Sequence, residues 1–251
     1  MPRLTPLTLP PGTLSGHPQP VLPVAGTEAV LRPWQEGDAE AVRAAYDDPA
    51  IQHWHARRAD TVAEAAEWIA EWRDAWHTES RAEWAIASGG TLLGRCGLNR
   101  IEALDGEGEV AYWTVPAARG KGLAPRAVRT LTDWAFASGF ARLVLQHSTG
   151  NTASCRVATK AGYPLEATRS AAARHTDGWH DMHAHVSLNP RTERVGRGQR
   201  RPGGGAGRAV RAGRTRRGVG GRARPGVDRA NSPSADRANT PRREPGQHAA
   251  P

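Results

Sequence analysis

The feature that most constrains the fold of this chain is a change of hydrophobic period at Pro116. Residues 109–115 are rich in the β-branched and aromatic side chains that strands prefer. Apolar side chains then recur at helical spacing over residues 127–135. Between the two patterns lies the glycine-rich stretch 119–124. A strand that enters a helix through such a loop indicates a fold in which helices pack against a sheet.

The glycine-rich loop predicts a binding site for an anion. Small residues let several backbone N–H groups converge on one ligand, and the N-terminus of the following helix adds the positive end of its dipole. Arg119 and Lys121 add positive charge, so a phosphate group is the expected ligand. The loop lacks the Gly-Lys-Ser/Thr sequence of a P-loop and does not follow the first strand, as a dinucleotide-binding loop would.

The remaining pattern predicts an α+β domain. Asp38 precedes a helix that Pro49 is expected to end, and Thr61 with Glu64 forms a capping-box pattern at the start of a second helix. Further helices are expected after Gly122 and at residues 151–160, and strands at residues 29–34, 83–87, 91–98, 109–115, 143–146, 163–168 and 180–188. The predicted order is βααβββαβαββ, with a mixed, mostly antiparallel central sheet flanked by helices.

Composition divides the chain into three regions. Residues 1–26 show no helical or strand period and are expected to be a flexible leader, whereas residues 27–189 are the predicted folded domain. Residues 190–251 contain hardly any aromatic or large aliphatic side chains, so they are expected to be disordered.

Charge follows the same division. The last 61 residues carry 16 arginines and 4 acidic residues, whereas residues 1–190 have a net charge of −3. The net charge of +9 therefore gives no reason to treat the folded part as a nucleic-acid-binding domain. A weak contact of the tail with polyanions is expected, although a GC-rich coding bias explains the same arginines.

The cysteines and histidines do not predict a metal site. Cys96 and Cys155 lack Cys-x-x-Cys spacing and a histidine in ligand register. His183 and His185 share one face of a strand, but no carboxylate or third histidine is in clear register with them. A solvated or hydrogen-bonded strand face is therefore preferred to a zinc site. Two cysteines without a disulfide framework fit a reduced compartment, and no apolar run is long enough to span a membrane, so a cytoplasmic location is expected.

Two segments resemble the GNAT superfamily of N-acetyltransferases. Arg119, Gly122 and Ala124 occupy the defining places of the family's motif A, Arg/Gln-x-x-Gly-x-Gly/Ala. The family's Asn-x-x-Ser segment, an apolar helix and a Gly-Phe/Tyr pair are matched at Asn151, Ser154, Gly162 and Tyr163. The sequence is most similar to the branch that acetylates the N-termini of ribosomal proteins.

The resemblance implies acetyl-CoA as the co-substrate, with no metal or second cofactor. The pantetheine arm is expected to lie like an additional strand in a V-shaped gap between the strand that ends near Val115 and the strand at residues 143–146. The residues implied to bind the coenzyme are Trp113, Thr114 and Val115 on the first strand, Arg119, Gly120, Lys121, Gly122, Leu123 and Ala124 around the pyrophosphate, and Asn151 and Ser154 on the opposite wall.

Two residues are candidates for catalysis, because amide formation needs a neutral amine and a proton for the departing thiolate. Glu109 resembles the glutamate of the ribosomal-protein branch and is the candidate base; an ion pair with an arginine is the competing structural interpretation. Many family members use a tyrosine seven residues after the asparagine as the acid, but this chain has Ala158 there. Ser154 is the replacement that the branch suggests, and a helix cap is its structural alternative.

The expected function is transfer of an acetyl group to a primary amine, on a protein N-terminus or a small molecule, by direct attack in a ternary complex. A non-catalytic acetyl-CoA-binding module and an aminoglycoside-type antibiotic acetyltransferase are the alternatives. The protein is expected to act as a monomer or homodimer without a membrane partner. The tryptophans at helical spacing, Trp68, Trp72 and Trp76, are expected to pack in the core.

Overall fold

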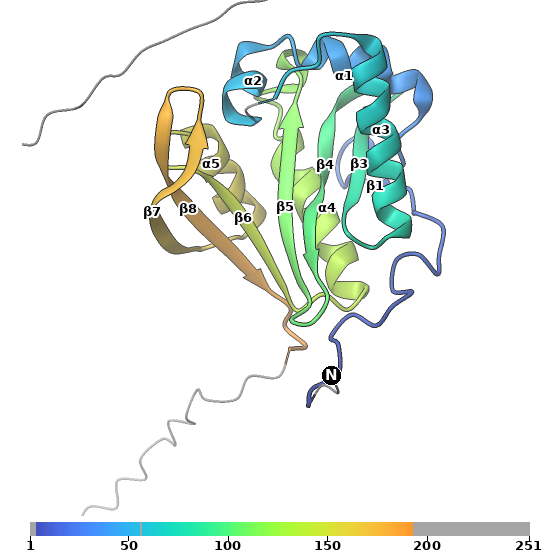
Figure 1. The fold of residues 1–251 in the computed structure, drawn as a ribbon, viewed down its shortest axis with the longest axis vertical. Coiled ribbons are helices and arrows are strands. Elements are labelled where there is room, and N and C mark those ends of the chain that lie inside the picture. Colours follow the sequence, from blue (N-terminus) through green and yellow to red (C-terminus); the bar gives the residue numbers. More distant parts are fainter. Residues whose placement is uncertain (1–3, 56, 193–251) are drawn as a thin grey trace, which may run out of the picture. The chain divides into compact units, whose positions relative to one another are not determined.

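The computed structural model describes residues 4–55 and 57–192, which form one eight-stranded sheet with helices on both faces (Figure 1). The strand order is β1-β2-β3-β4-β5-β6-β8-β7, and every neighbouring pair is antiparallel except β5 with β6. The strands are β1 (Leu22–Pro23), β2 (Val30–Arg32), β3 (Ala82–Ser88), β4 (Thr91–Glu102), β5 (Glu107–Thr114), β6 (Arg142–Ser148), β7 (Leu165–His175) and β8 (Gly178–Leu188). The α-helices are α1 (Ala39–Ala45), α2 (Pro49–His55), α3 (Val62–His77), α4 (Leu123–Ala137) and α5 (Thr152–Ala161).

The predicted α+β architecture and element order are confirmed, and the structure adds β1 and α2. The helix expected to end at Pro49 already ends at Ala45, and Pro49 is instead the first residue of α2. A proline at that position costs little, because the first helical residue has no intrahelical partner for its N–H. The closing hairpin is also longer than predicted, since β7 continues to His175 and β8 begins at Gly178.

The starts of α3 and α1 are fixed in different ways, the first by a local capping box and the second by a contact with a strand. At α3 the predicted capping box is present: the Glu64 N–H donates to Thr61 Oγ1 at 3.2 Å, and the Thr61 N–H donates to the Glu64 carboxylate at 3.3 Å. Asp38 precedes α1 without capping it. Its carboxylate instead accepts two hydrogen bonds of 2.7 Å from the Arg32 guanidinium, which ties the start of α1 to β2.

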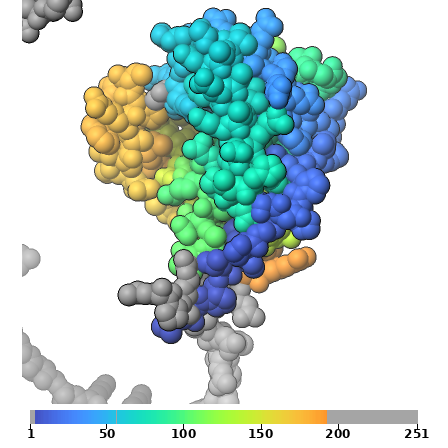
Figure 2. All heavy atoms as spheres, turned by 45° about the vertical axis from the view of Figure 1, so that its right-hand side comes forward, coloured from blue at the N-terminus to red at the C-terminus, as the bar shows by residue number. Residues whose placement is uncertain are grey.

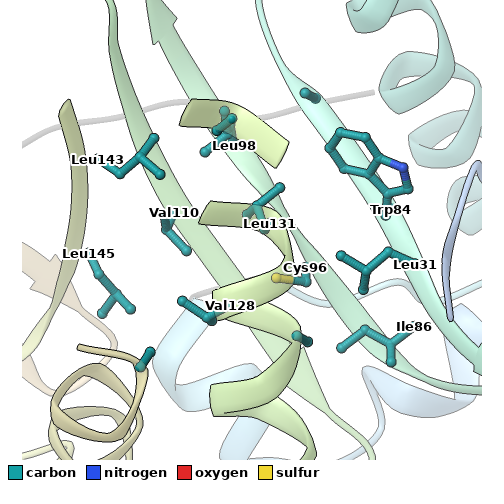
Figure 3. Close-up of a cluster of buried hydrophobic side chains, with 14 of the residues drawn as sticks. Leu31, Trp84, Ile86, Cys96, Leu98, Val110, Val128, Leu131, Leu143 and Leu145 are labelled. Atoms are coloured by element: carbon teal, nitrogen blue, oxygen red, sulfur yellow. The ribbon is translucent and has the colours of Figure 1, made fainter. Parts of the chain in front are cut away.

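The core has two layers, one on each face of the sheet. On the α4 face, Val128 and Leu131 pack against strand residues such as Trp84, Leu98 and Val110 (Figure 3). On the other face, α1 and α3 cover the sheet through a second cluster that contains Trp34, Tyr46, Ile69, Trp72 and Trp113. The prediction for the helical tryptophans is confirmed for Trp72 and Trp76, which are buried, whereas Trp68 is only partly buried.

β5 and β6 pair for only part of their length. Their register runs through four positions, from Glu107 opposite Arg142 to Val110 opposite Leu145. Beyond Val110, β5 still pairs with β4 but has no partner on its β6 side. On the other side of β5, the pairing register with β4 shifts at Asn99, which lies between Leu98 and Arg100. Such a bulge bends and twists the strands that contain it, and here it lies beside the point where β5 leaves β6.

The N-terminal segment differs from the flexible leader predicted for residues 1–26, of which residues 4–26 are described. Leu9, Leu14 and Val24 are buried in the same cluster as α4. The Glu79 carboxylate accepts hydrogen bonds from the backbone N–H groups of Gly12, Leu14 and Ser15 at 2.7–3.1 Å. In the space-filling view the dark-blue segment lies directly against the body of the domain (Figure 2). Isolated apolar residues without a period were therefore enough to dock this segment.

The predicted tail, residues 190–251, lies outside the described residues from position 193 onward. Within residues 4–55 and 57–192, no helix combines the length and the apolar composition that crossing a bilayer requires.

We predict that Leu14→Ala lowers the free energy of unfolding by about 2–4 kcal/mol, because Leu14 is 2% exposed and its removal leaves a cavity. Urea denaturation measures this change. Leu4→Ala is the matched control, because Leu4 is fully exposed. Equal stability of the two variants would show that the segment does not contribute to the core.

Candidate active site

A cavity of about 490 Å³ opens where β5 and β6 separate. Its volume is in the range of sites for small molecules and cofactors. Four parts of the chain form its walls: the end of β5, the loop and first turn of α4, α5 with the residue before it, and α2. Segments that are up to about a hundred residues apart thus meet at one gap in the sheet.

The glycine-rich loop forms one end of the cavity. Gly120 and Gly122 have φ values of 77° and 73°, a left-handed conformation that side chains other than glycine rarely adopt. Gly122 is the N-cap residue of α4, so the N–H groups that follow it have no intrahelical acceptor. Because Gly120, Gly122, Leu123 and Ala124 line the cavity, this end can bind an anion through backbone amides and the helix dipole.

Arg119 holds the loop in place. Its guanidinium donates to the Asp48 carboxylate at 2.8 Å and to the Thr114 carbonyl oxygen at 3.1 Å. This guanidinium lowers the pKa of Asp48, which also accepts from the Ile51 N–H at 3.0 Å in the first turn of α2. The arginine that the sequence assigned to the phosphates therefore also connects the loop to α2.

The predicted coenzyme-binding residues are largely brought together. Trp113, Thr114, Arg119, Gly120, Gly122, Leu123, Ala124, Asn151 and Ser154 all line the cavity. Lys121 and Val115 do not. Lys121 is exposed outside the cavity, and the Val115 N–H already donates to the Leu93 carbonyl oxygen at 3.0 Å.

The first turn of α5 forms the opposite wall. Asn151 caps this helix, because its Oδ1 accepts from the Ser154 N–H at 3.0 Å. The interpretation of Ser154 as the cap is therefore wrong. Its hydroxyl instead forms a 2.8 Å hydrogen bond across the cavity with the hydroxyl of Tyr112 on β5.

Sequence reasoning missed Tyr112. Burial raises the pKa of this phenol, and the hydrogen bond with Ser154 opposes the shift only in part, so the Tyr112 side chain is neutral at physiological pH. The family's usual tyrosine position on α5 holds Ala158, which is fully buried. The position of Tyr112 in the sequence could have identified it. It lies on the strand that precedes the glycine-rich loop, and this strand was expected to border the gap for the pantetheine arm.

Glu109 does not line the cavity. It lies on the paired part of β5, opposite Val144 of β6. Its carboxylate is 3.6 Å from the Arg100 guanidinium, so the ion pair with an arginine, which was the structural alternative for Glu109, is present. Burial raises the pKa of Glu109, and the positive charge of Arg100 opposes this shift.

Helix α2, which the sequence did not predict, provides the remaining wall. Ile51, Trp54 and His55 line the cavity from this helix. Burial, with a contribution from the positive charge of Arg95, lowers the pKa of His55 to about 4, so its imidazole is neutral at physiological pH. This wall is therefore aromatic and uncharged.

Comparison with known sequences identifies relatives of this chain. The sequence profile described as the acetyltransferase (GNAT) domain matches residues 29–164, more than half of the chain. The Bacillus subtilis (strain 168) protein YdaF, named as a candidate ribosomal N-acetyltransferase, is 27% identical over 131 residues, which are 52% of this chain and 70% of YdaF.

Solved structures share the fold. A Salmonella typhimurium acetyltransferase, described as modifying the N-terminal serine of 50S ribosomal subunit protein L7/L12, aligns with a TM-score of 0.62 at 19% identity and covers 67% of this chain and 99% of its own. The microcin C7 self-immunity acetyltransferase MccE, solved with acetyl-CoA and AMP, aligns with a TM-score of 0.60 at 18% identity, over 66% of this chain and 94% of its own. At these identities the likeness concerns the fold alone.

We predict that Ala124→Glu lowers the affinity for coenzyme A by more than about 100-fold. The introduced carboxylate and the pyrophosphate are both negatively charged, and like charges at one site repel by several kcal/mol. The fold should be kept, since a glutamate in the first turn of a helix is favoured by the dipole. Ala137→Glu is the matched control, because Ala137 is exposed at the other end of α4. Calorimetric titration measures both, and unchanged affinity of Ala124→Glu would exclude the loop as the anion site.

Proposed function

The chain belongs to the acetyltransferase (GNAT) family, and on this basis we propose that it transfers the acetyl group of acetyl-CoA to the α-amino group of a protein N-terminus. The observation that carries the proposal is a single cavity with an amide-lined anion site at one end and the Tyr112–Ser154 hydroxyl pair on its walls. The first feature suits a pyrophosphate, and the second suits the leaving thiolate.

The residues around the cavity suit acetyl-CoA. The backbone amides of Gly120, Gly122, Leu123 and Ala124 provide donors for the pyrophosphate. The edge of β5 that has no partner beyond Val110 offers backbone groups to the pantetheine amides, as a sheet edge does to an added strand. Asn151 and Ser154 face it from the other wall. The coenzyme supplies the acetyl thioester, and the chain supplies orientation and proton transfer.

We assign the proton donor to Tyr112, with Ser154 as its partner. When the amine nitrogen bonds to the carbonyl carbon and the carbon–sulfur bond breaks, the departing sulfur takes a proton. Tyr112 stays protonated because burial raises its pKa, and Ser154 at 2.8 Å orients the phenol and stabilises negative charge on its oxygen. The proton that the amine loses then restores the phenol through solvent.

We assign the general base to Glu109, acting through water because its side chain lies outside the cavity. The pKa of Glu109 is raised by burial, which makes it a stronger base than an exposed carboxylate. The positive charge of Arg100 partly neutralises the negative charge of the Glu109 carboxylate.

A distant base favours an acceptor that loses its proton easily. An α-amino group has a pKa of about 7.7–8.0, whereas a lysine side chain has a pKa of about 10.4. Because an α-amine is partly neutral at physiological pH, positioning with modest base assistance suffices for it. The name of YdaF and the described activity of the Salmonella structure point to the same class of acceptor.

The acceptor is tested with purified protein and acetyl-CoA against three acceptor classes. Peptides with a free serine or alanine N-terminus should be acetylated fastest; N-terminally blocked lysine peptides and aminoglycosides should react slowly or not at all. Preference for aminoglycosides would assign the antibiotic-modifying function instead. Tight acetyl-CoA binding without turnover on any acceptor would indicate a non-catalytic binding module.

We predict that Tyr112→Phe lowers kcat by about 100-fold with little change in the KM for acetyl-CoA, because only proton donation is removed. Tyr163→Phe is the matched control: Tyr163 is also buried, and its hydroxyl bonds Thr132 outside the cavity. Steady-state kinetics distinguish them. Equal kcat values for Tyr112→Phe and the parent would remove Tyr112 as the acid.

We predict that Glu109→Gln slows transfer to N-terminal peptides mainly below about pH 7.7, where most of the amine is protonated. Above about pH 8 the defect should shrink, because the amine is increasingly neutral without a base. Glu107→Gln is the control, since Glu107 is on the same strand and binds Arg142 at 2.8 Å. Rate measurements across pH decide the assignment; coincident profiles of Glu109→Gln and the parent would exclude Glu109 as the base.

A further inference from the structure

Three histidines and a cysteine converge between α5 and the sheet. His147 comes from β6, His183 and His185 from β8, and Cys155 from α5, and one ligand atom of each lies within 4.8 Å of the other three. In the sequence alone, His183 and His185 have no carboxylate or third histidine in clear register with them. The fold supplies the missing ligands, because antiparallel pairing puts His147 opposite His183 and α5 lies over both strands.

Backbone carbonyls orient two of the imidazoles. His185 Nδ1 is 2.9 Å from the Tyr163 carbonyl oxygen, and His147 Nδ1 is 2.8 Å from the Ser148 carbonyl oxygen. A carbonyl oxygen only accepts hydrogen bonds, so in both rings Nδ1 carries the proton and Nε2 keeps a lone pair that can bind a metal ion. The Nε2 of His185 is 4.0 Å from the Cys155 sulfur. Histidine ligands of metal ions are commonly held in this way.

Two ring nitrogens in the cluster are buried without a partner. His147 is 5% exposed, and its Nε2 has no hydrogen-bond partner among the described residues; the Nδ1 of His183 is in the same condition. Burying a polar atom without a partner is unfavourable, and such atoms are rare in folded proteins. A metal ion that accepts the lone pair of such a nitrogen would be the missing partner.

We propose that His147, Cys155, His183 and His185 bind one divalent transition-metal ion of the zinc class. Imidazole and thiolate donors suit zinc and its neighbours, whereas magnesium and calcium require oxygen ligands. In a tetrahedral zinc site the ligand atoms are about 3.3–3.8 Å apart, so the side chains close in by about 1 Å. As the metal–sulfur bond forms, the Cys155 thiol releases its proton to solvent.

The proposed site is structural. Four protein ligands complete a tetrahedral shell, so no position remains for a substrate. The ion fastens α5 to β6 and β8, and α5 carries both Asn151 and Ser154 of the cavity wall. Bound metal is therefore expected to raise the melting temperature and to slow amide hydrogen exchange in α5.

The test uses the full-length, tag-free protein after removal of metal with a chelator. Titration with Co²⁺ should end at one equivalent and produce a sulfur-to-cobalt charge-transfer band together with the strong visible bands of a tetrahedral ion. Addition of Zn²⁺ should abolish the charge-transfer band and the visible bands and should raise the melting temperature. Failure to bind Co²⁺ or Zn²⁺, or a cobalt complex without the charge-transfer band, would overturn the proposal.

Variants locate the ion. Cys155→Ala should abolish the charge-transfer band and weaken Zn²⁺ binding by at least about tenfold. His53→Ala is the matched control, because His53 lies outside the proposed site: its Nε2 is 3.9 Å from the Asp177 carboxylate. Unchanged Zn²⁺ affinity in Cys155→Ala, or its loss in His53→Ala, would place the ion elsewhere. Because Cys155 is only half-buried, its replacement by alanine should leave the fold intact, which circular dichroism verifies.

Discussion

The separation of β5 from β6 is the constraint on which the rest of the structure depends. Two parallel strands that stayed paired along their full length would leave no free backbone edge and no room between α4 and α5. Because pairing ends at Val110 and Leu145, the remaining part of β5 keeps one edge open, and the cavity lies along this edge. The loop that starts α4 and the first turn of α5 approach the same opening because they follow the ends of these two strands.

The anion site depends on backbone conformation more than on side-chain charge. Gly120 and Gly122 adopt left-handed conformations, although a Cβ atom at either position would have no neighbouring atom within 4 Å. Glycine is thus required by the path of the chain rather than by lack of space. Arg119 supports that path through Asp48, and in doing so it joins the cavity's anion end to its aromatic wall on α2.

Helix α5 serves two sites because neighbouring residues on a helix point about 100° apart. Ser154 faces the cavity and bonds Tyr112, whereas Cys155 faces the histidines of the sheet. Its N-cap at Asn151 and its C-terminal Gly162, at φ 90°, fix where the helix begins and ends. A change in how α5 packs on β8 would consequently reach the Ser154 hydroxyl.

The sequence by itself determined the features that depend on neighbours in the chain. The period change at Pro116 and the capping box at Thr61 specify elements through local geometry, and the family motifs at residues 119–124 and 151–154 located two parts of the cavity wall. Local rules failed at Pro49, because a proline marks the start of a helix as well as the end of one.

Only the tertiary structure decided which distant side chains meet. Tyr112 and Ser154 are 42 residues apart and form a pair only because β5 has lost its neighbour there. The docking of residues 4–26 likewise depends on Glu79 and on the core, since the segment has no period of its own. The histidine–cysteine cluster shows the same limit: strand register and helix placement bring its members together, and neither is encoded in the spacing of the residues along the chain.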